Sequence, residues 1–230
     1  MNQVDRRAVS RRDTASPRKP QRKNGREKYE RLLDALEKLI VEREAGDITL
    51  ANLSQSAGVP AASVYHFFPS VDASLTALAE RHYAAFTEAL TSYPQFSPRE
   101  SWQNLVFQLC DQARAYYEVN EPALKVHFGP QTSRALRQLQ IENNWRLADT
   151  LLQGIRREFE LPPSQEWRER FLLAITINDA FWALSYSRFG RITEEIAAEG
   201  KRAAAAYLKL YLGELLEQRL SDRWTERAPL

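Results

Sequence analysis

The sequence is poor in the residues that build disulfide-linked, metal-bound or membrane-spanning proteins. Its 230 residues include one cysteine, Cys110, which excludes a disulfide framework and a cysteine-based metal cage. Charged residues interrupt every apolar stretch well before the ~20 residues that a membrane-spanning helix needs. The first residues include Asp5 and Asp13 and no apolar run, which argues against a secretory or transit peptide. These absences predict a soluble, cytoplasmic protein without a membrane partner.

Motifs for catalysis are also missing. The three histidines, His66, His82 and His127, lack the paired spacing of metal ligands. There is no glycine-rich phosphate loop and no nucleophile elbow. Cys110 lies on the apolar side of a predicted helix, where a cysteine is more often a small core residue than a nucleophile. We therefore expect no enzyme activity, no cofactor and no metal site.

Glycine and proline are scarce, with eight and eleven residues, and they separate long stretches rich in strong helix formers. Alternating apolar and polar runs bounded by hairpin turns are absent. An all-α fold is predicted, with three or four short helices before about five longer ones. The helical patterns cover 26–44, 50–57, a short segment that opens at Pro60, and a segment that opens near Ser70. After a break at 93–98, they cover 101–120, a shorter piece from Glu121, 133–160, 164–189 and 193–220.

The net charge of +2 conceals an uneven distribution. Residues 1–25 carry eight Lys and Arg against two Asp, a net charge of +6, whereas residues 26–92 carry −4 and residues 93–230 balance. Such a basic segment with few apolar residues cannot bury enough surface to fold alone, so 1–25 is predicted to be a disordered arm. The arm either binds nucleic acid or another polyanion, or serves as a solubilising leader.

Residues 50–64 have the spacing of a helix-turn-helix. Leu53 and Ala57 lie one turn apart on the inner face of the first helix, Gly58 can take positive φ in the turn, and Val64 can anchor the second helix in the core. Two helices joined by a tight turn leave the second one protruding, so that its outer face can enter a DNA major groove. A scaffold that packs on protein is the alternative.

The segment 49–59 has the sequence TLANLSQSAGV, and 63–70 has SVYHFFPS. Together they resemble the N-terminal domain of TetR-family transcriptional regulators over about residues 28–90. The resemblance implies an N-terminal three-helix DNA-binding domain, here 26–92, joined to a helical ligand-binding and dimerisation domain, here 93–230. It also implies a homodimer, most often a repressor, that binds double-stranded palindromic operator DNA and is released by a small-molecule effector.

The predicted recognition helix is unusual in content. The family commonly has a lysine directly after Pro-Ser, where it meets a DNA phosphate, and Val71 stands here instead. Between Val59 and Ser70 there is no Arg, Lys, Asn or Gln, the side chains best suited to reading base edges. We therefore expect the arm to supply much of the phosphate binding. The predicted DNA-binding residues are Thr49, Pro60, Ala61, Ala62, Ser63, Tyr65, His66 and Ser70 in the head, and Arg22, Lys23, Arg26 and Lys28 around the end of the arm.

Three alternatives stay open at this stage. Thr49 suits a plain N-cap as well as a phosphate contact. Tyr65 suits a position at the edge of the core as well as a DNA contact. The missing lysine keeps a third alternative, that the whole chain is a ligand- or protein-binding module with weakened DNA affinity.

The segment 93–230 is rich in aromatic residues, and the resemblance implies a small-molecule pocket between its helices. Bundle pockets are typically apolar with a few polar groups. Asn178 and Asp179 interrupt an otherwise apolar run over 175–182. The alternative is that the aromatics form ordinary core and that Asn178 lies between helices. The predicted ligand-binding residues are Arg114, Tyr117, His127, Trp145, Asn178 and Trp182.

An apolar stripe with small residues on the last two predicted helices predicts a dimer interface, since Gly200 and the alanines at 203–206 would let another helix approach closely. The alternative is that the stripe only covers its own domain. A two-fold dimer would present two recognition helices ~34 Å apart. The predicted interface residues are Phe171, Ile175, Ile196, Ala203, Ala204, Tyr207, Tyr211 and Leu215.

Overall fold

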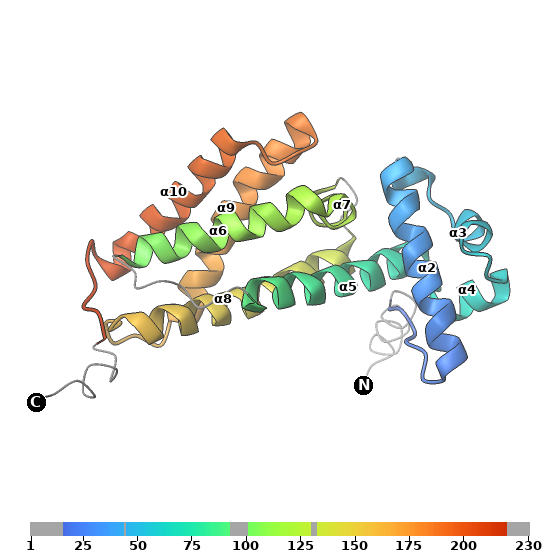
Figure 1. The fold of residues 1–230 in the computed structure, drawn as a ribbon, viewed down its shortest axis with the longest axis horizontal. Helices are drawn as coiled ribbons and strands as arrows, with labels where there is room; N and C mark the ends of the chain where they lie inside the picture. The colour runs from blue at the N-terminus through green and yellow to red at the C-terminus, as the bar shows by residue number, and fades with distance from the viewer. Residues whose placement is uncertain (1–15, 44, 93–100, 130–132, 220–230) are drawn as a thin grey trace, which may run out of the picture.

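The computed structural model describes residues 16–43, 45–92, 101–129 and 133–219, so the break at 93–98 lies outside it. Within these residues the chain is all-helical, as predicted. A small head and a larger body are joined by one long helix, α5 (Figure 1). The head contains α2 (Lys23–Glu42), a 3-10 turn (Ala45–Asp47), α3 (Leu50–Ala57) and α4 (Ala61–Phe67). The linking helix is α5 (Val71–Ser92), and the body contains α6 (Trp102–Val119), α7 (Glu121–Phe128), α8 (Arg134–Glu158), α9 (Trp167–Phe189) and α10 (Glu194–Leu212).

Polar caps fix where several helices begin. The hydroxyls of Thr49 and Ser101 accept hydrogen bonds from the backbone N–H groups of Asn52 and Asn104. The hydroxyls of Ser133 and Thr193 cap α8 and α10 in the same way. Each hydroxyl satisfies a backbone donor that has no partner within its helix. The starts of these helices could therefore be predicted to within one residue.

The end of the arm differs from the prediction. Helix α2 begins at Lys23, three residues earlier than expected. The residues before it contact α4 and α5. The Arg18 N–H donates to the Phe67 carbonyl at 2.8 Å, and Lys19 Nζ lies 2.7 Å from a carboxylate oxygen of Glu80. These contacts offset the conformational entropy that residues 16–22 lose when they become ordered. Residues 1–15 lie outside the described part of the chain.

The end of α10 also differs from the prediction. The helix stops at Leu212, well before the expected end near Leu220, because Gly213 takes a φ of 73° that breaks the helical hydrogen-bond ladder. Leu215, predicted for a helical interface stripe, therefore lies beyond the helix and is 80% exposed.

The helices enclose a head core that continues into the body. Leu36, Leu53 and Val64 are fully buried in the head, and Val126 of α7 and Leu136 of α8 belong to the same cluster. Lys125 Nζ donates a hydrogen bond to the Val41 carbonyl near the end of α2 at 3.0 Å. The head is therefore packed against the body.

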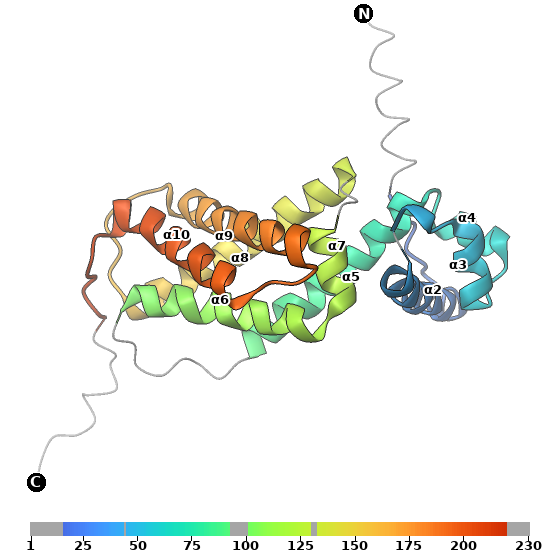
Figure 2. The same ribbon diagram turned by 90° about the horizontal axis from the view of Figure 1, so that it is seen from above.

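The body has a core of its own, and α9 and α10 lie side by side within it (Figure 2). Trp102, Leu105, Ile155 and Leu208 are all fully buried there. Over the described residues, no helix combines the length and the apolar character that crossing a membrane requires.

Candidate nucleic-acid interface and inner cavity

The turn between α3 and α4 has the geometry that the sequence predicts. Gly58 takes a φ of 60°, a left-handed conformation that favours glycine. Next to it, the Val59 N–H donates to the Ser54 carbonyl at 3.2 Å, and Ser54 Oγ donates to the Val59 carbonyl at 2.7 Å. Val59 and Val64 are buried on either side of the turn. These contacts hold α4 as the second helix of a helix-turn-helix.

The outer face of α4 is largely exposed to solvent. Val64 and Phe67 point inward and are buried, whereas Tyr65 is 55% exposed. Tyr65 therefore does not cover the core edge, which was the alternative from the sequence. Ser63 is half-buried at the side of the helix. The remaining predicted contacts on this helix are all exposed, namely Pro60, Ala61, Ala62 and His66.

Thr49 and Ser70 flank this face as helix caps. The Thr49 hydroxyl takes part in a capping box with Asn52, and it lies at the surface. The Ser70 hydroxyl accepts a hydrogen bond from the Ala73 N–H at 3.1 Å and so caps α5. Capping does not exclude a DNA contact, because a hydroxyl has a donor as well as two acceptor sites.

The start of α2 lies beside the end of α4 (Figure 1). The Tyr29 ring packs on Phe67 and Phe68, with ring centroids 5.6 and 5.1 Å apart. Because the Arg18 N–H donates a hydrogen bond to the Phe67 carbonyl, the described end of the arm also lies beside the end of α4. The predicted basic contacts here are Arg22, Lys23 and Arg26, which are exposed, and Lys28, which is half-buried.

The body contains a cavity of about 80 Å³ that residues from each of the helices α5 to α10 line. Its wall is mostly apolar, with Phe86 of α5 and Leu147 of α8 among the residues that line it. The polar part of the wall is a small cluster: Asn144 Nδ2 donates to Asp179 Oδ2 at 2.8 Å, and His127 Nε2 lies 3.8 Å from the same oxygen.

Four of the six predicted ligand-binding residues line this cavity, namely Tyr117, His127, Asn178 and Trp182. The other two do not. Arg114 lies in a neighbouring surface groove and pairs with Glu118 at 2.9 Å. Trp145 lies outside the cavity, under the guanidinium of Arg168 at 4.4 Å, because its position on α8 faces that surface arginine.

Cys110 also lines the cavity, and burial raises the pKa of its thiol to about 12. The thiolate is the reactive form, so little of it exists at pH 8. We predict that iodoacetamide alkylates Cys110 in the folded chain on the order of a thousandfold more slowly than in the chain unfolded in guanidinium. Mass spectrometry of timed samples measures both rates. Equal rates would show that the thiol is open to solvent.

Comparisons with known proteins agree with this architecture. Residues 100–212 match the family model described as "Tetracyclin repressor-like, C-terminal domain". Over 66 residues, the chain is 41% identical to the HTH-type transcriptional repressor NemR of Escherichia coli K12. That match covers 29% of this chain and spans about a third (33%) of the relative's length.

Solved structures resemble the fold over most of its length. A TetR-family transcriptional regulator from Streptomyces coelicolor superposes with a TM-score of 0.64 at 23% identity, covering 80% of this chain and 99% of the other. E. coli NemR in its reduced form gives 0.53 at 21%, covering 84% and 100%. Residues 100–212 thus belong to the C-terminal domain of the TetR family, and the other matches support a TetR-family transcriptional regulator.

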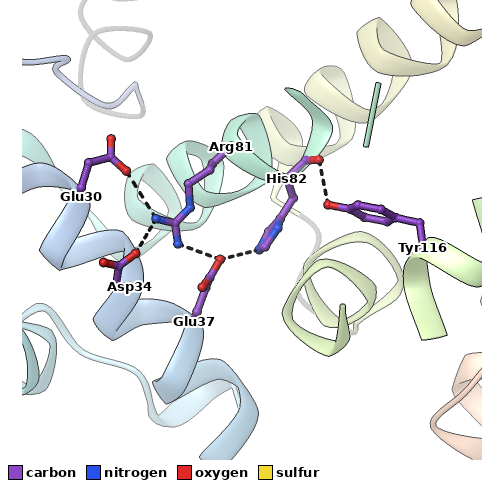
Figure 3. Close-up of polar contacts among 6 residues, drawn as sticks. All are labelled: Glu30, Asp34, Glu37, Arg81, His82 and Tyr116. Atoms are coloured by element: carbon purple, nitrogen blue, oxygen red, sulfur yellow. Dashed lines mark hydrogen bonds and ion pairs between the residues drawn. The ribbon is translucent and has the colours of Figure 1, made fainter. Parts of the chain in front are cut away.

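In this TetR-family chain, an ionic network joins head and linking helix (Figure 3). Arg81 of α5 lies 2.7 Å from Asp34 and from Glu37 and 3.4 Å from Glu30, all three on α2. The same Glu37 oxygen lies 3.3 Å from His82 Nε2. Burial lowers the pKa of His82, although the Glu37 carboxylate opposes this shift. One arginine thus fixes α5 to three carboxylates of the TetR-type head.

The network reaches the body through one tyrosine. Tyr116 Oη of α6 donates to the backbone carbonyl of His82 at 3.3 Å (Figure 3). The Tyr116 ring also packs edge-on against Phe86 and Tyr117, both of which line the cavity. A continuous set of contacts therefore runs from the cavity wall to the head of this TetR-family chain.

The predicted interface residues of the last two helices do not all reach the surface. Phe171 and Ala204 are 0% and 2% exposed in the subunit's own core, so they cannot contact a partner. Ile175 is half-buried against the same core. The other predicted residues reach the surface to different degrees: Ile196, Ala203 and Tyr207 are half-buried, and Tyr211 is exposed.

Sequence reasoning missed the exposed apolar residues of α9. Leu173 and Leu184 are 44% and 52% exposed, and Ile177 and Ala180 lie between them on the same side. The last three follow Leu173 by four, seven and eleven residues, which places all four on one side of a helix, and none is charged. This uncharged stripe was the sequence signal that could have identified the surface. Leu210 of α10 is also exposed, at 75%, and we call these five residues the α9/α10 face.

Proposed function

We propose that the chain is a dimeric transcriptional regulator, most simply a repressor, whose α4 helices bind a palindromic DNA operator and which a small molecule in the cavity releases. One observation carries the proposal: a helix-turn-helix holds α4 with Tyr65 and His66 on an outer face that no part of the described core covers. The named repressor NemR, similar over a third of its length, supports the direction of control.

The chemistry of α4 suits apolar and single hydrogen-bond contacts to bases. Alanine methyls pack on thymine methyls, and hydroxyl and imidazole groups reach base edges or phosphates. Sequence-independent attraction then has to come from elsewhere, and the exposed Arg22, Lys23 and Arg26 beside the end of α4 supply it. The rest of the arm, residues 1–21, adds further positive charge.

The exposed side chains of the α9/α10 face support dimerisation through it. Leu173, Leu184 and Leu210 would each leave a large apolar surface in water, whereas a second copy of the face would cover them. A two-fold axis through this face makes the interface self-complementary and gives two α4 helices per dimer.

Release by a ligand requires that it bind one state of the body better than another. A cavity of about 80 Å³ holds only a few non-hydrogen atoms, so a larger molecule must move the wall. Phe86 belongs to that wall and sits on α5, the helix that Arg81 ties to the head. Displacement of Phe86 therefore changes the position of the head, and with it the distance between the two α4 helices.

The test is selection of genomic DNA fragments by the purified chain at two salt concentrations. We expect recovery of an inverted repeat, with stronger enrichment at the lower salt. The double variant Tyr65→Ala/His66→Ala should bind that repeat about 10- to 100-fold more weakly, since each residue loses a base or phosphate contact. Both side chains are exposed, so the thermal midpoint should stay unchanged.

Phe189→Ala is the matched control, because Phe189 is 50% exposed on α9 and far from α4 in sequence. It should bind the repeat like the unaltered chain. If selection returns unrelated fragments, the chain does not read DNA. A ligand- or protein-binding module would then be the better assignment, which Val71 in place of the usual lysine favours.

A further inference from the structure

We propose that the cavity binds a small apolar molecule that carries an organic cation, such as a protonated amine, with Asp179 as the counter-ion. The role of this molecule as an effector rests on the proposed function above, whereas its binding does not.

The wall has one carboxylate and no lysine or arginine to neutralise it. Asp179 is the only Asp, Glu, Lys or Arg among the described residues that line the cavity. Its hydrogen-bond donor is the neutral amide of Asn144, and the ring nitrogen of His127 lies at 3.8 Å, beyond hydrogen-bond distance. A carboxylate offers about four acceptor sites, so Asp179 retains capacity for a donor that carries charge.

A second acceptor lies next to this carboxylate. Asn144 is buried, and its amide nitrogen is used by Asp179, whereas its Oδ1 has no hydrogen-bond partner among the described residues. A buried acceptor without a partner is costly and points to a group that arrives later. An ammonium group, with several N–H donors and no acceptor, satisfies both residues at once.

Aromatic rings complete the surroundings that a cation prefers. Tyr117 stacks on Phe86 with centroids 5.4 Å apart and meets Trp182 edge-on at 6.1 Å. All three residues line the cavity. The faces of such rings attract cations, most strongly where water is excluded. The rest of the wall suits the apolar part of the molecule.

The groove outside the cavity carries charge of the matching sign. Tyr117 lines both spaces and is only 5% exposed, so it stands between them. The groove measures about 520 Å³, and its charged residues give a net charge of −2. A negative rim raises the local concentration of cations and repels anions. Its charged residues are Arg114, Arg191, Glu118, Glu121, Glu194 and Glu195.

Three probes of nearly equal size and different charge test the proposal: 2-phenylethylammonium, 2-phenylethanol and phenylacetate. All three are larger than the cavity of about 80 Å³, so each has to move the wall to a similar extent and the comparison isolates the effect of charge. Titration calorimetry with the full chain at pH 7 should show the ammonium binding at least about tenfold more tightly than the alcohol, and phenylacetate binding most weakly. Equal or tighter binding of the alcohol or of phenylacetate would overturn the proposal without any variant.

The variant Asp179→Asn keeps the shape and removes the charge, so it should bind the ammonium and the alcohol equally. Asp149→Asn is the matched control, because Asp149 is paired with Arg168 outside the cavity, and it should keep the preference. Retention of the full preference by Asp179→Asn would contradict the assignment. Circular dichroism melting checks that both variants fold, and the probe series on the unaltered chain stands if one does not.

Failure of this proposal can be told apart from failure of the proposed function. An ammonium that binds through Asp179 to a chain that selects no DNA supports the cavity assignment and refutes the regulator. A chain that selects an inverted repeat but shows no preference for the ammonium refutes the cavity assignment alone.

Discussion

Deleting residues 1–15 should make the binding of operator DNA much less dependent on salt. The deletion removes Arg6, Arg7, Arg11 and Arg12 from each subunit. Each arginine that meets a phosphate contributes ~0.9 to the slope of log K against log[salt]. Contact by all eight arginines of a dimer would change the slope by about 7, and contact by a few would still lower affinity by an order of magnitude or more at low salt.

The structure makes this deletion cleaner than removal of the whole arm. Residues 16–22 contact the head through Arg18 and Lys19, so a truncation at residue 26 would also disturb the start of α2. Fluorescence anisotropy over a series of salt concentrations measures the slope. A full-length chain with the four arginines changed to glutamine is the matched control for chain length. If the shortened chain keeps the original slope, the segment is a solubilising leader.

Phe171→Ala should lower the free energy of unfolding by about 3–5 kcal/mol. The side chain is fully buried, beside Trp167, and its removal leaves a cavity that the rigid core fills poorly. Guanidinium unfolding followed by circular dichroism, at one fixed protein concentration, measures the loss. A loss below about 1 kcal/mol would show that Phe171 lies at a surface after all.

Leu184→Glu complements Phe171→Ala by testing the α9/α10 face as the dimer contact. Leu184 lies on that face and was not predicted for the interface. A charge there should leave the fold intact and separate the subunits, because burying an unpaired carboxylate in an apolar interface is costly. Sedimentation equilibrium should show folded monomers. A dimer of unchanged affinity would exclude this face as the contact.

Local signals explain why the head could be predicted. A threonine cap, a glycine with positive φ and an anchoring valine act on neighbouring residues in the chain, so Thr49, Gly58 and Val64 specify their turn directly. The ordered conformation of residues 16–22 could not be predicted in the same way. It depends on Phe67 and Glu80, which are distant in sequence.

The body shows where periodicity stops being informative. Both sides of α9 carry apolar residues, and the pattern cannot tell the side that meets its own core, with Phe171, from the side that meets solvent, with Leu173. Asn144 was missed because it stands in a polar stretch, although it falls on the inward stripe with Ala148 and Leu151 of α8. Trp145 was chosen for its size, and its position on the helix turns it away from the cavity.

The uninterrupted α5 helix has a consequence for redesign. Its 22 residues contain neither proline nor glycine, and Arg81 and Phe86 are five residues, ~8 Å, apart along it. Under the proposed mechanism, any guest that displaces Phe86 moves the same stiff helix, whatever its own chemistry. The lining could be re-engineered to recognise a different analyte while the output stays as it is, which makes this scaffold suitable for biosensors whose input and readout are altered independently.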